Sequence, residues 1–273
     1  MGHRLVYAQS DTSRFAERFF RAEIAAAAAA QVGLSFFWYT DEMQRFHGFN
    51  DLNQWGGMDK VGHGFTAYRI TRLNSDLLSA LGMDPKRARM RSFLLSQAFL
   101  IGVEVLDGFS SNYGFSGFDV LANAAGGVLG LVHNSSGWQQ GIQLKYNYRR
   151  SGLASLRPDL LGSNGSERWL KDYNGQTYWL SVFPGHFTDK KFPKWIGMSM
   201  GYGIHGFLGG RSNPIGLPAI QRSREFQLAL DVDLVQLFRK TKWGRHLRWI
   251  SFVKLPLPGI QFRQGSGPRL GFY

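Results

Sequence analysis

The character of this chain changes near residue 140, and that change limits the possible folds more than any other feature. Before it, long stretches suit helices, with six consecutive alanines at positions 25–30. After it, Gly, Pro, Asn and Ser interrupt short apolar runs, which is typical of strands joined by turns. The sequence therefore predicts an α+β fold, an N-terminal helical bundle packed with a C-terminal antiparallel β-sheet or small open barrel.

Four helices are expected in the first half of the chain. Ser13 is a candidate cap for the first helix, and Pro85 suits the first turn of the third. The predicted helices cover residues 13–39, 59–72, 85–106 and 117–132, with loops at 41–58 and 108–115. The helical domain then extends over residues 13–139, and the β-rich domain over residues 140–273.

The clearest strand lies at residues 226–234. Alternate positions from Phe226 to Leu234 are apolar, and the positions between them carry Gln227, Ala229 and two aspartates. A period of two predicts a half-buried strand with one apolar and one polar face. Further strands are predicted at residues 142–148, 176–183, 196–202, 248–254 and 269–273.

The first twelve residues allow two interpretations. Val6 and Ala8 suit the −3 and −1 positions of a signal-peptidase site, although the apolar run before the site is short. We interpret residues 1–12 as the remnant of a signal peptide or as a disordered tail. The alanine-rich segment that follows approaches the length of a membrane span, but alanine is only weakly apolar, so a packed helix is favoured.

Composition narrows the classes of partner. The net charge is +13 and 15% of residues are aromatic, which suits contact with an anionic lipid surface; an aromatic-rich core and a solvated basic surface are the alternatives. The sequence carries no helix-turn-helix, zinc-finger or RNA-binding signature, so no nucleic-acid partner is expected. The absence of cysteine excludes disulfides, thiolate zinc sites, a cysteine nucleophile and a lipid attached through cysteine.

Three of the predicted helices carry polar residues at helical spacing within apolar surroundings. These residues are Asp59, Lys60, His63, Glu104, Asp107, Asp119 and Asn123. Each taken alone has a structural explanation, such as capping or an ion pair. A charged residue in an apolar helix is costly unless it is paired, so we expect the seven to form one cluster where the helices meet. Gly126, Gly127 and Gly130 would let a neighbouring backbone approach the last helix closely.

Common catalytic motifs are missing from the sequence. It has no Gly-x-Ser-x-Gly elbow, Walker loop, His-Glu-x-x-His motif or dinucleotide fingerprint. A histidine with two or more carboxylates can bind a metal or serve as acid and base, so the cofactor stays open.

The order of the polar blocks resembles a known family. Trp55-Gly-Gly-Met-Asp59-Lys60-Val-Gly-His63, Glu104-Val-Leu-Asp107 and Ser116-Gly-Phe-Asp119-Val-Leu-Ala-Asn123 are similar to predicted periplasmic proteins of unknown function, the YfiM-like family. They resemble the VanZ-like membrane proteins more distantly. Residues 170–181 and 254–258 look like the β-rich tail of the longer family members. The resemblance implies export and residence in the cell envelope, periplasm or outer membrane, and implies no reaction. Unlike the lipoprotein members, this chain has no cysteine for lipidation.

Two functions follow as expectations. The first is a membrane-associated envelope protein with a scaffolding, assembly or lipid-binding role, whose partners are an anionic membrane surface and envelope proteins. The alternative is a hydrolase or transferase that acts on an envelope lipid or cell-wall intermediate through the histidine and carboxylates. Convergence of these side chains in an open pocket would favour the enzyme, and their mutual pairing between helices would favour the scaffold.

Overall fold

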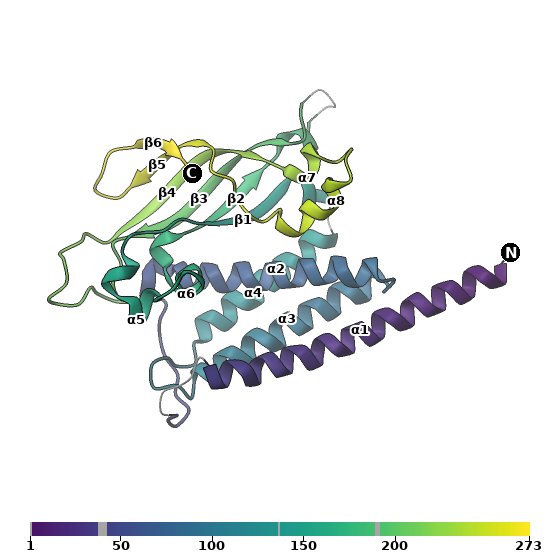
Figure 1. The fold of residues 1–273 in the computed structure, drawn as a ribbon, viewed down its shortest axis with the longest axis horizontal. Coiled ribbons are helices and arrows are strands. Elements are labelled where there is room, and N and C mark those ends of the chain that lie inside the picture. Colours follow the sequence, from purple (N-terminus) through teal and green to yellow (C-terminus); the bar gives the residue numbers. More distant parts are fainter. Residues whose placement is uncertain (1, 38–42, 136, 189–191) are drawn as a thin grey trace. The chain divides into compact units, whose positions relative to one another are not determined.

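The computed structural model describes residues 2–37, 43–135, 137–188 and 192–273, and the chain divides into two compact units (Figure 1). The helical unit comprises Met1–Leu52 and Gly62–Ser136, and the β unit comprises Asn53–Val61 and Gly137–Tyr273. The fold is α+β, as predicted, with long helices in the first half and an antiparallel sheet in the second. In the described part of the chain, no helix has both the length and the apolar character needed to cross a membrane.

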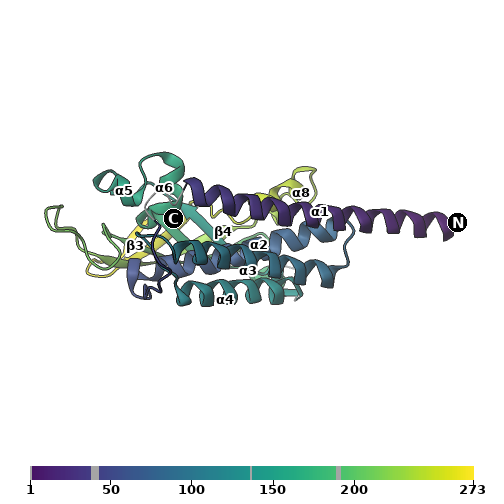
Figure 2. The same ribbon diagram turned by 90° about the horizontal axis from the view of Figure 1, so that it is seen from below.

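Long helices build the helical unit. They are α1 (Gly2–Phe37), α2 (Met58–Ala80), α3 (Pro85–Asp107) and α4 (Gly117–Ser135), and a 3-10 turn, η1 (Gln54–Gly57), precedes α2. Figure 2 shows α2, α3 and α4 side by side. The side chain of Asp84 accepts a hydrogen bond from the Arg87 backbone N–H, and Pro85 occupies the first turn, so α3 begins where the sequence predicted.

The first helix starts earlier than predicted. α1 begins at Gly2 rather than at Ser13, so residues 2–12 are helical rather than a disordered tail. The interpretation of this segment as a signal-peptide remnant stays a prediction. Residues 38 and 39, the predicted end of the helix, lie outside the described residues.

Helix α2 is longer than predicted. The sequence pattern placed its end at Arg72, but α2 continues to Ala80. The extra turns are stabilised by packing, because Leu78 is fully buried with Ala16 of α1 and Ala88 of α3 in a small apolar core.

The β unit is an open antiparallel sheet in which each strand pairs with its neighbour in sequence, β1-β2-β3-β4-β5-β6. The strands are β1 (Ile142–Tyr148), β2 (Gln176–Val182), β3 (Ile196–His205), β4 (Ser223–Val232), β5 (Pro258–Arg263) and β6 (Arg269–Phe272). Short helices occupy the connections: α5 (Pro158–Leu161), α6 (Gly165–Lys171), α7 (Leu234–Leu237) and α8 (Trp243–Leu247). The 3-10 turns are η2 (Gly137–Gln140), η3 (Ala154–Leu156), η4 (Tyr173–Gly175), η5 (Pro184–His186) and η6 (Arg248–Ile250).

Two strand predictions need correction. The strand predicted at 248–254 is wrong, because its first residues form η6 and only Val253 makes an isolated bridge, to Tyr146. The real fifth strand, β5, was missed because Pro258 interrupts the apolar pattern at its first residue. β4 ends at Val232, since the Asp233 side chain accepts hydrogen bonds from the next two backbone N–H groups and caps α7.

In an ordinary half-buried strand the apolar residues are buried and the polar residues are exposed, and in β4 the reverse holds. The polar positions Glu225, Gln227 and Asp231 are buried, and the apolar positions Phe226 and Leu228 are exposed. The same inversion extends across the sheet. We call the buried polar side the inner face; it comprises Gln143, Lys145, Thr177, Ser181, Ser199, Glu225, Gln227, Asp231 and Gln261, none more than 9% exposed.

The polar residues of the inner face are buried together with Trp179 and Ala229 because the sheet curls around them. Lys145 on β1 bonds Asp231 on β4 at 3.0 Å, although β2 and β3 lie between these strands. Neighbouring strands are about 4.8 Å apart, so two side chains span this separation only if the sheet curves towards its polar side. Gly201 on β3 provides space there, since a Cβ would collide with the ring of Trp179.

Candidate functional site

Four of the seven predicted site residues, a histidine and the three that surround it, lie together in the helical unit. The His63 Nδ1 atom lies 3.5 Å from Glu104 Oε1 and 3.3 Å from Asn123 Oδ1. The opposite ring atom, Nε2, lies 3.9 Å from Asp119 Oδ1. Glu104, Asp119 and Asn123 are buried, while the His63 side chain keeps 21% of its surface exposed. The histidine is therefore held by acidic and amide groups and can still be reached from outside.

Asp59 and Lys60 lie on the first turn of α2, and this turn belongs to the β unit. Lys60 Nζ donates to Asp59 Oδ2 at 2.8 Å, and the Tyr173 hydroxyl donates to Asp59 Oδ1 at 2.7 Å. Because α2 is one continuous helix, Asp59 precedes His63 by about one turn on the same side. We call His63, Glu104, Asp119 and Asn123, which all lie in the helical unit, the polar cluster.

Small residues allow the helices of the polar cluster to approach one another. A Cβ at Gly126 of α4 would collide with the backbone of Gly64, the residue after His63 in α2. The two backbones therefore cross in direct contact beside the cluster. Gln97 of α3 fixes the third helix, since its Nε2 donates to the Asn123 carbonyl at 3.0 Å.

Two further residues hold the carboxylates in place. The Ser116 hydroxyl caps α4 by accepting from the Asp119 N–H, and the same hydroxyl donates to Asp51 Oδ1 at 2.7 Å. The Ser116 N–H donates to Glu104 Oε2 at 3.3 Å. The Ser-x-x-Asp spacing pointed to the role of Ser116. Asp51 was missed because it sits in a loop with no periodic pattern.

Asp107 occupies a different position from Glu104. It is the last residue of α3, about one turn further on, and its backbone carbonyl accepts from the Ser110 N–H. Its membership of the cluster stays a prediction.

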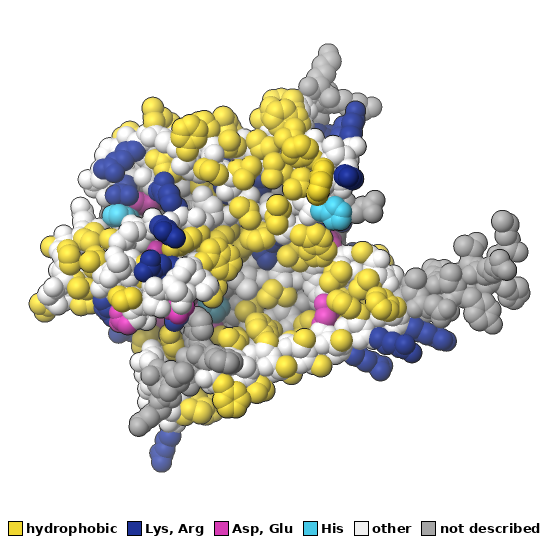
Figure 3. All heavy atoms as spheres, in the orientation of Figure 1, with side chains coloured by type: hydrophobic (Ala, Val, Ile, Leu, Met, Phe, Trp, Pro, Cys, Tyr) yellow, Lys and Arg dark blue, Asp and Glu magenta, His cyan; other side chains and the backbone are white. Residues whose placement is uncertain are grey.

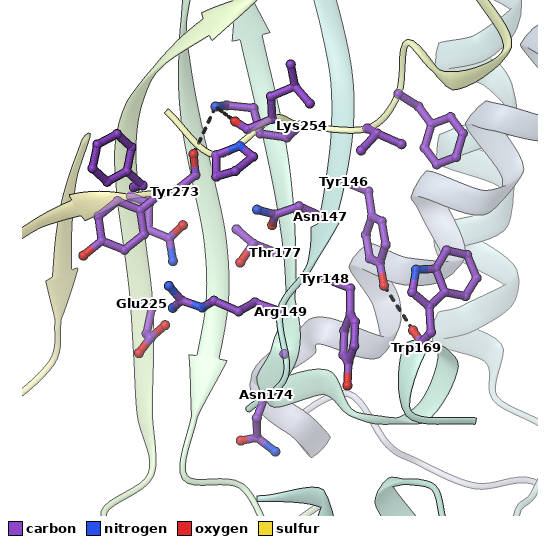
Figure 4. Close-up of a pocket in the computed structure, with 17 residues that line it drawn as sticks. Tyr146, Asn147, Tyr148, Arg149, Trp169, Asn174, Thr177, Glu225, Lys254 and Tyr273 are labelled. Carbon is purple, nitrogen blue, oxygen red and sulfur yellow. Dashed lines mark hydrogen bonds between the residues drawn. The ribbon is translucent and has the colours of Figure 1, made fainter. Parts of the chain in front are cut away.

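The β unit holds a second candidate site, a cavity of about 470 Å³ (Figure 4). Tyr146 and Tyr148 lie on one side of it and Glu225 and Tyr273 on the other, with Thr177 and Arg149 between them. Burial raises the pKa of Glu225 above its usual range. Arg263 pairs with the carboxylate and acts in the opposite direction, but the effect of burial is the larger.

Lys254 also lines this cavity, and its ammonium group is fully used by the fold. Nζ donates to the carbonyls of Leu230, Leu255 and Tyr273 at 2.8–3.2 Å. These bonds fasten the segment after η6 and the end of the chain to β4. The lysine is therefore a structural clamp rather than a nucleophile, although burial lowers its pKa to about 8.

Comparison with known proteins bears on one segment of the chain, which ends before the strands of the sheet begin. Residues 47–135 match the family described as "Predicted periplasmic lipoprotein (DUF2279)". The matched segment covers about a third of the chain and contains every residue of the polar cluster. It supports an uncharacterised cell-envelope protein, in line with the YfiM-like resemblance. The more distant VanZ-like resemblance has no such support and stays a prediction. No curated protein and no solved structure gave a significant match.

Proposed function

We propose that this protein is a cell-envelope protein that docks on an anionic lipid bilayer through the outer face of its sheet. The observation that carries the proposal is the inverted burial of the β unit. The side chains opposite the inner face form a continuous apolar face: Leu180, Val182, Met198, Met200, Phe226, Leu228, Leu230, Ile260, Phe262, Leu270 and Phe272. Each of these is between 37% and 84% exposed.

The register makes this apolar face contiguous. Leu180, Met200, Leu228, Ile260 and Leu270 are direct neighbours on five successive strands. Soluble proteins rarely expose an apolar patch beyond a few hundred Å², because each Å² of apolar surface left in water costs about 25 cal/mol. The row of five large side chains and the rows beside it therefore form a surface that we expect a binding partner to cover.

One end of the sheet has the composition of a membrane interface. The connections from β2 to β3 and from β4 to β5 leave the same end, because neighbouring strands are antiparallel. They carry the exposed aromatic residues Phe187, Phe192, Trp195, Phe238, Trp243 and Trp249. Exposed cations accompany them: Lys194, Arg239, Lys240, Lys242 and Arg248. Figure 3 shows hydrophobic side chains gathered over α7 and α8 with basic side chains beside them.

The chemistry of this end favours lipid over a second copy of the chain. Aromatic rings partition to the headgroup level of a bilayer, and lysine and arginine attract anionic headgroups at about 1 kcal/mol each. A second copy would bring an equal charge of +13 against the first, whereas an anionic bilayer complements it.

Vesicle flotation tests the proposal. The full chain should float with vesicles of phosphatidylethanolamine and phosphatidylglycerol, and less with phosphatidylcholine alone. The double variant Met200→Gln/Leu228→Gln should lose binding at least about tenfold, because it removes apolar contact and leaves the charge unchanged. The matched control is Met90→Gln/Leu94→Gln, which alters two equally exposed apolar residues of α3 and should bind as the native chain does.

Other outcomes would overturn the proposal. Equal flotation of both double variants would show that the sheet face does not contact lipid. A native chain that stays with the soluble fraction and sediments as an oligomer, with Met200→Gln/Leu228→Gln monomeric, would assign the face to self-association instead.

A second candidate function is an enzyme acting on an envelope lipid or cell-wall intermediate. The specific observation in its favour is the partly exposed ring of His63 between Glu104 and Asp119, an arrangement that can accept and pass on a proton. A cellular phenotype abolished by His63→Gln in a stably folded chain would support it, and an unchanged phenotype would exclude it.

A further inference from the structure

We propose that the cavity of the β unit binds an acidic saccharide, a sugar that carries a carboxylate or a phosphate group. The residues that line the cavity all belong to the β unit, so the site is complete within one compact unit. Its volume of about 470 Å³ is typical of a small-molecule site. The inference does not rest on the lipid-docking proposal, which concerns the outer face of the sheet.

Two buried polar side chains face the cavity without a partner from the fold. Gln227 on β4 is 3% exposed and Thr177 on β2 is 9% exposed, and both line the cavity. Within the described residues, neither the Gln227 amide nor the Thr177 hydroxyl makes a hydrogen bond. Buried polar groups are rarely left unbonded, so these two are available to a molecule in the cavity.

Asn147 on β1 adds a third polar group to the same wall. Its Oδ1 accepts a hydrogen bond from Trp179 Nε1 at 3.1 Å, and this bond leaves its Nδ2 as a donor for a ligand. An amide, a hydroxyl and an amide N–H together supply both donors and acceptors, which is what the hydroxyl groups of a sugar require. A lipid tail in the cavity would leave all three groups without hydrogen bonds, so the lining disfavours an acyl chain.

Aromatic rings stand on both sides of these polar groups. Tyr146 and Tyr148 lie on one side and Tyr273 on the other (Figure 4). The Tyr146 ring is held in place, because its hydroxyl donates to the Trp169 carbonyl at 3.1 Å and its ring packs edge-on against the Trp169 ring. A sugar ring has two apolar faces of C–H groups, which pack on the negative face of an aromatic ring, and hydroxyls around its edge. Aromatic sides with polar groups between them therefore suit a sugar.

The charge at the cavity favours an acidic sugar over a neutral one. The guanidinium of Arg149 lies over the Tyr273 ring, 5.9 Å from its centre, and makes no hydrogen bond or ion pair in the described part of the chain. The nearby carboxylate of Glu225 is already held, since Gln261 donates to one oxygen at 2.8 Å and Arg263 to the other at 2.6 Å. A guanidinium is always charged and presents paired N–H donors, so Arg149 can bind a carboxylate or a phosphate.

NMR titration of the full chain with three amino sugars tests this proposal. The probes are N-acetylmuramic acid, which carries a carboxylate, N-acetylglucosamine 1-phosphate, and neutral N-acetylglucosamine. At least one acidic sugar should bind with a Kd of about 1 mM or lower, and at least about tenfold more tightly than the neutral sugar. The tighter of the two acidic sugars shows whether the site takes a carboxylate or a phosphate.

Substitutions separate the charged contact from the polar contacts. Arg149→Gln should reduce the affinity for the acidic sugars to that for the neutral sugar, because it removes the charge alone. Thr177→Val and Gln227→Leu keep much of the side-chain shape and remove hydrogen bonds, so each should weaken all three sugars by about 2–10-fold. The matched control is Arg224→Gln, which removes an equal charge from an exposed residue of β4 outside the cavity and should bind as the native chain does.

Several results would overturn the proposal. They are a native chain that binds none of the sugars at about 10 mM, an Arg149→Gln variant that binds the acidic sugars as the native chain does, and an equal loss in Arg224→Gln. Circular dichroism shows whether each variant is folded, and the exposed Arg149 keeps the test decisive if a buried variant does not fold. Arg149→Gln should float with anionic vesicles as the native chain does, so failure of either proposal leaves the other standing.

Discussion

The two units each bury charged side chains, but they do so in different ways. In the β unit, Lys145 pairs with Asp231, and both side chains are at most 2% exposed. Lys145 donates to Asp231 directly, and Ser199 donates to the second carboxylate oxygen. In the helical unit, the two carboxylates of Glu104 and Asp119 lie beside His63, whose side chain is 21% exposed. A closed pair with matched charge is typical of structure, and an accessible cluster with excess carboxylate is typical of ligand binding.

The largest expected effect breaks the closed pair. Lys145→Met leaves Asp231 charged and buried, so the free energy of unfolding should fall by about 3–5 kcal/mol. The double variant Lys145→Met/Asp231→Leu should recover most of that loss, because neither member of this pair is left without the other. Urea denaturation measures both. A loss below about 1 kcal/mol in the single variant would show that the pair is not buried as the structure has it.

The inverted burial of the sheet predicts the next effect. Ser199→Ala removes a buried hydroxyl that donates to Asp231 and bonds Ser181, so it should cost about 1–3 kcal/mol. Leu228→Gln, on the exposed side, should change stability by no more than about 0.5 kcal/mol. An ordinary half-buried sheet would give the reverse order, with the leucine substitution costly and the serine substitution neutral.

A smaller effect is expected in the polar cluster. Glu104→Gln should lower the free energy of unfolding by about 0.5–1.5 kcal/mol, because glutamine still accepts from the Ser116 N–H. Thermal and urea unfolding at neutral pH would measure this. A loss as large as that of Lys145→Met would indicate that the polar cluster stabilises the fold as the buried ion pair does. The two units would then not differ in how they use their buried charges.

The smallest effect concerns pH and Lys254. Burial lowers the pKa of Lys254 to about 8, below its usual value of 10.5, so folding disfavours the charged form. Below pH 8 the lysine is protonated in both the folded and the unfolded chain, and the full cost of burying the charge is present. Between pH 8 and 10.5 the folded chain loses the proton first, so that cost falls. The stability of the native chain relative to Lys254→Met should therefore rise over this range, as measured by denaturation at pH 7, 9 and 10.

Elements with a strong local signal were predictable from the sequence. The Pro85 start of α3 follows from capping chemistry, and the alternation in β4 follows from the period of a strand. The convergence of Glu104 and His63 was expected from the cost of an unpaired buried carboxylate, and the structure brings their atoms within 3.5 Å.

Features set by the tertiary fold were not predictable in this way. Alternation shows that β4 has two faces, but only the curl of the sheet decides which of them is buried, and that depends on Lys145, distant in sequence. Asp51 lies in a loop without periodic pattern, so nothing local connects it to the cluster. The extra turns of α2 likewise depend on Leu78 meeting α1 and α3.

Spin labelling of the sheet tests the docking account most directly, since the chain has no cysteine and a single introduced one is labelled uniquely. Nitroxides at Met200→Cys and Leu228→Cys should become more accessible to oxygen and less accessible to a water-soluble nickel relaxant when anionic vesicles are added. A label at Ser212→Cys, in the exposed connection between β3 and β4, should keep its accessibility to both. If the labels at 200 and 228 respond to vesicles no more than the label at 212, the apolar face does not enter the bilayer and the account is wrong.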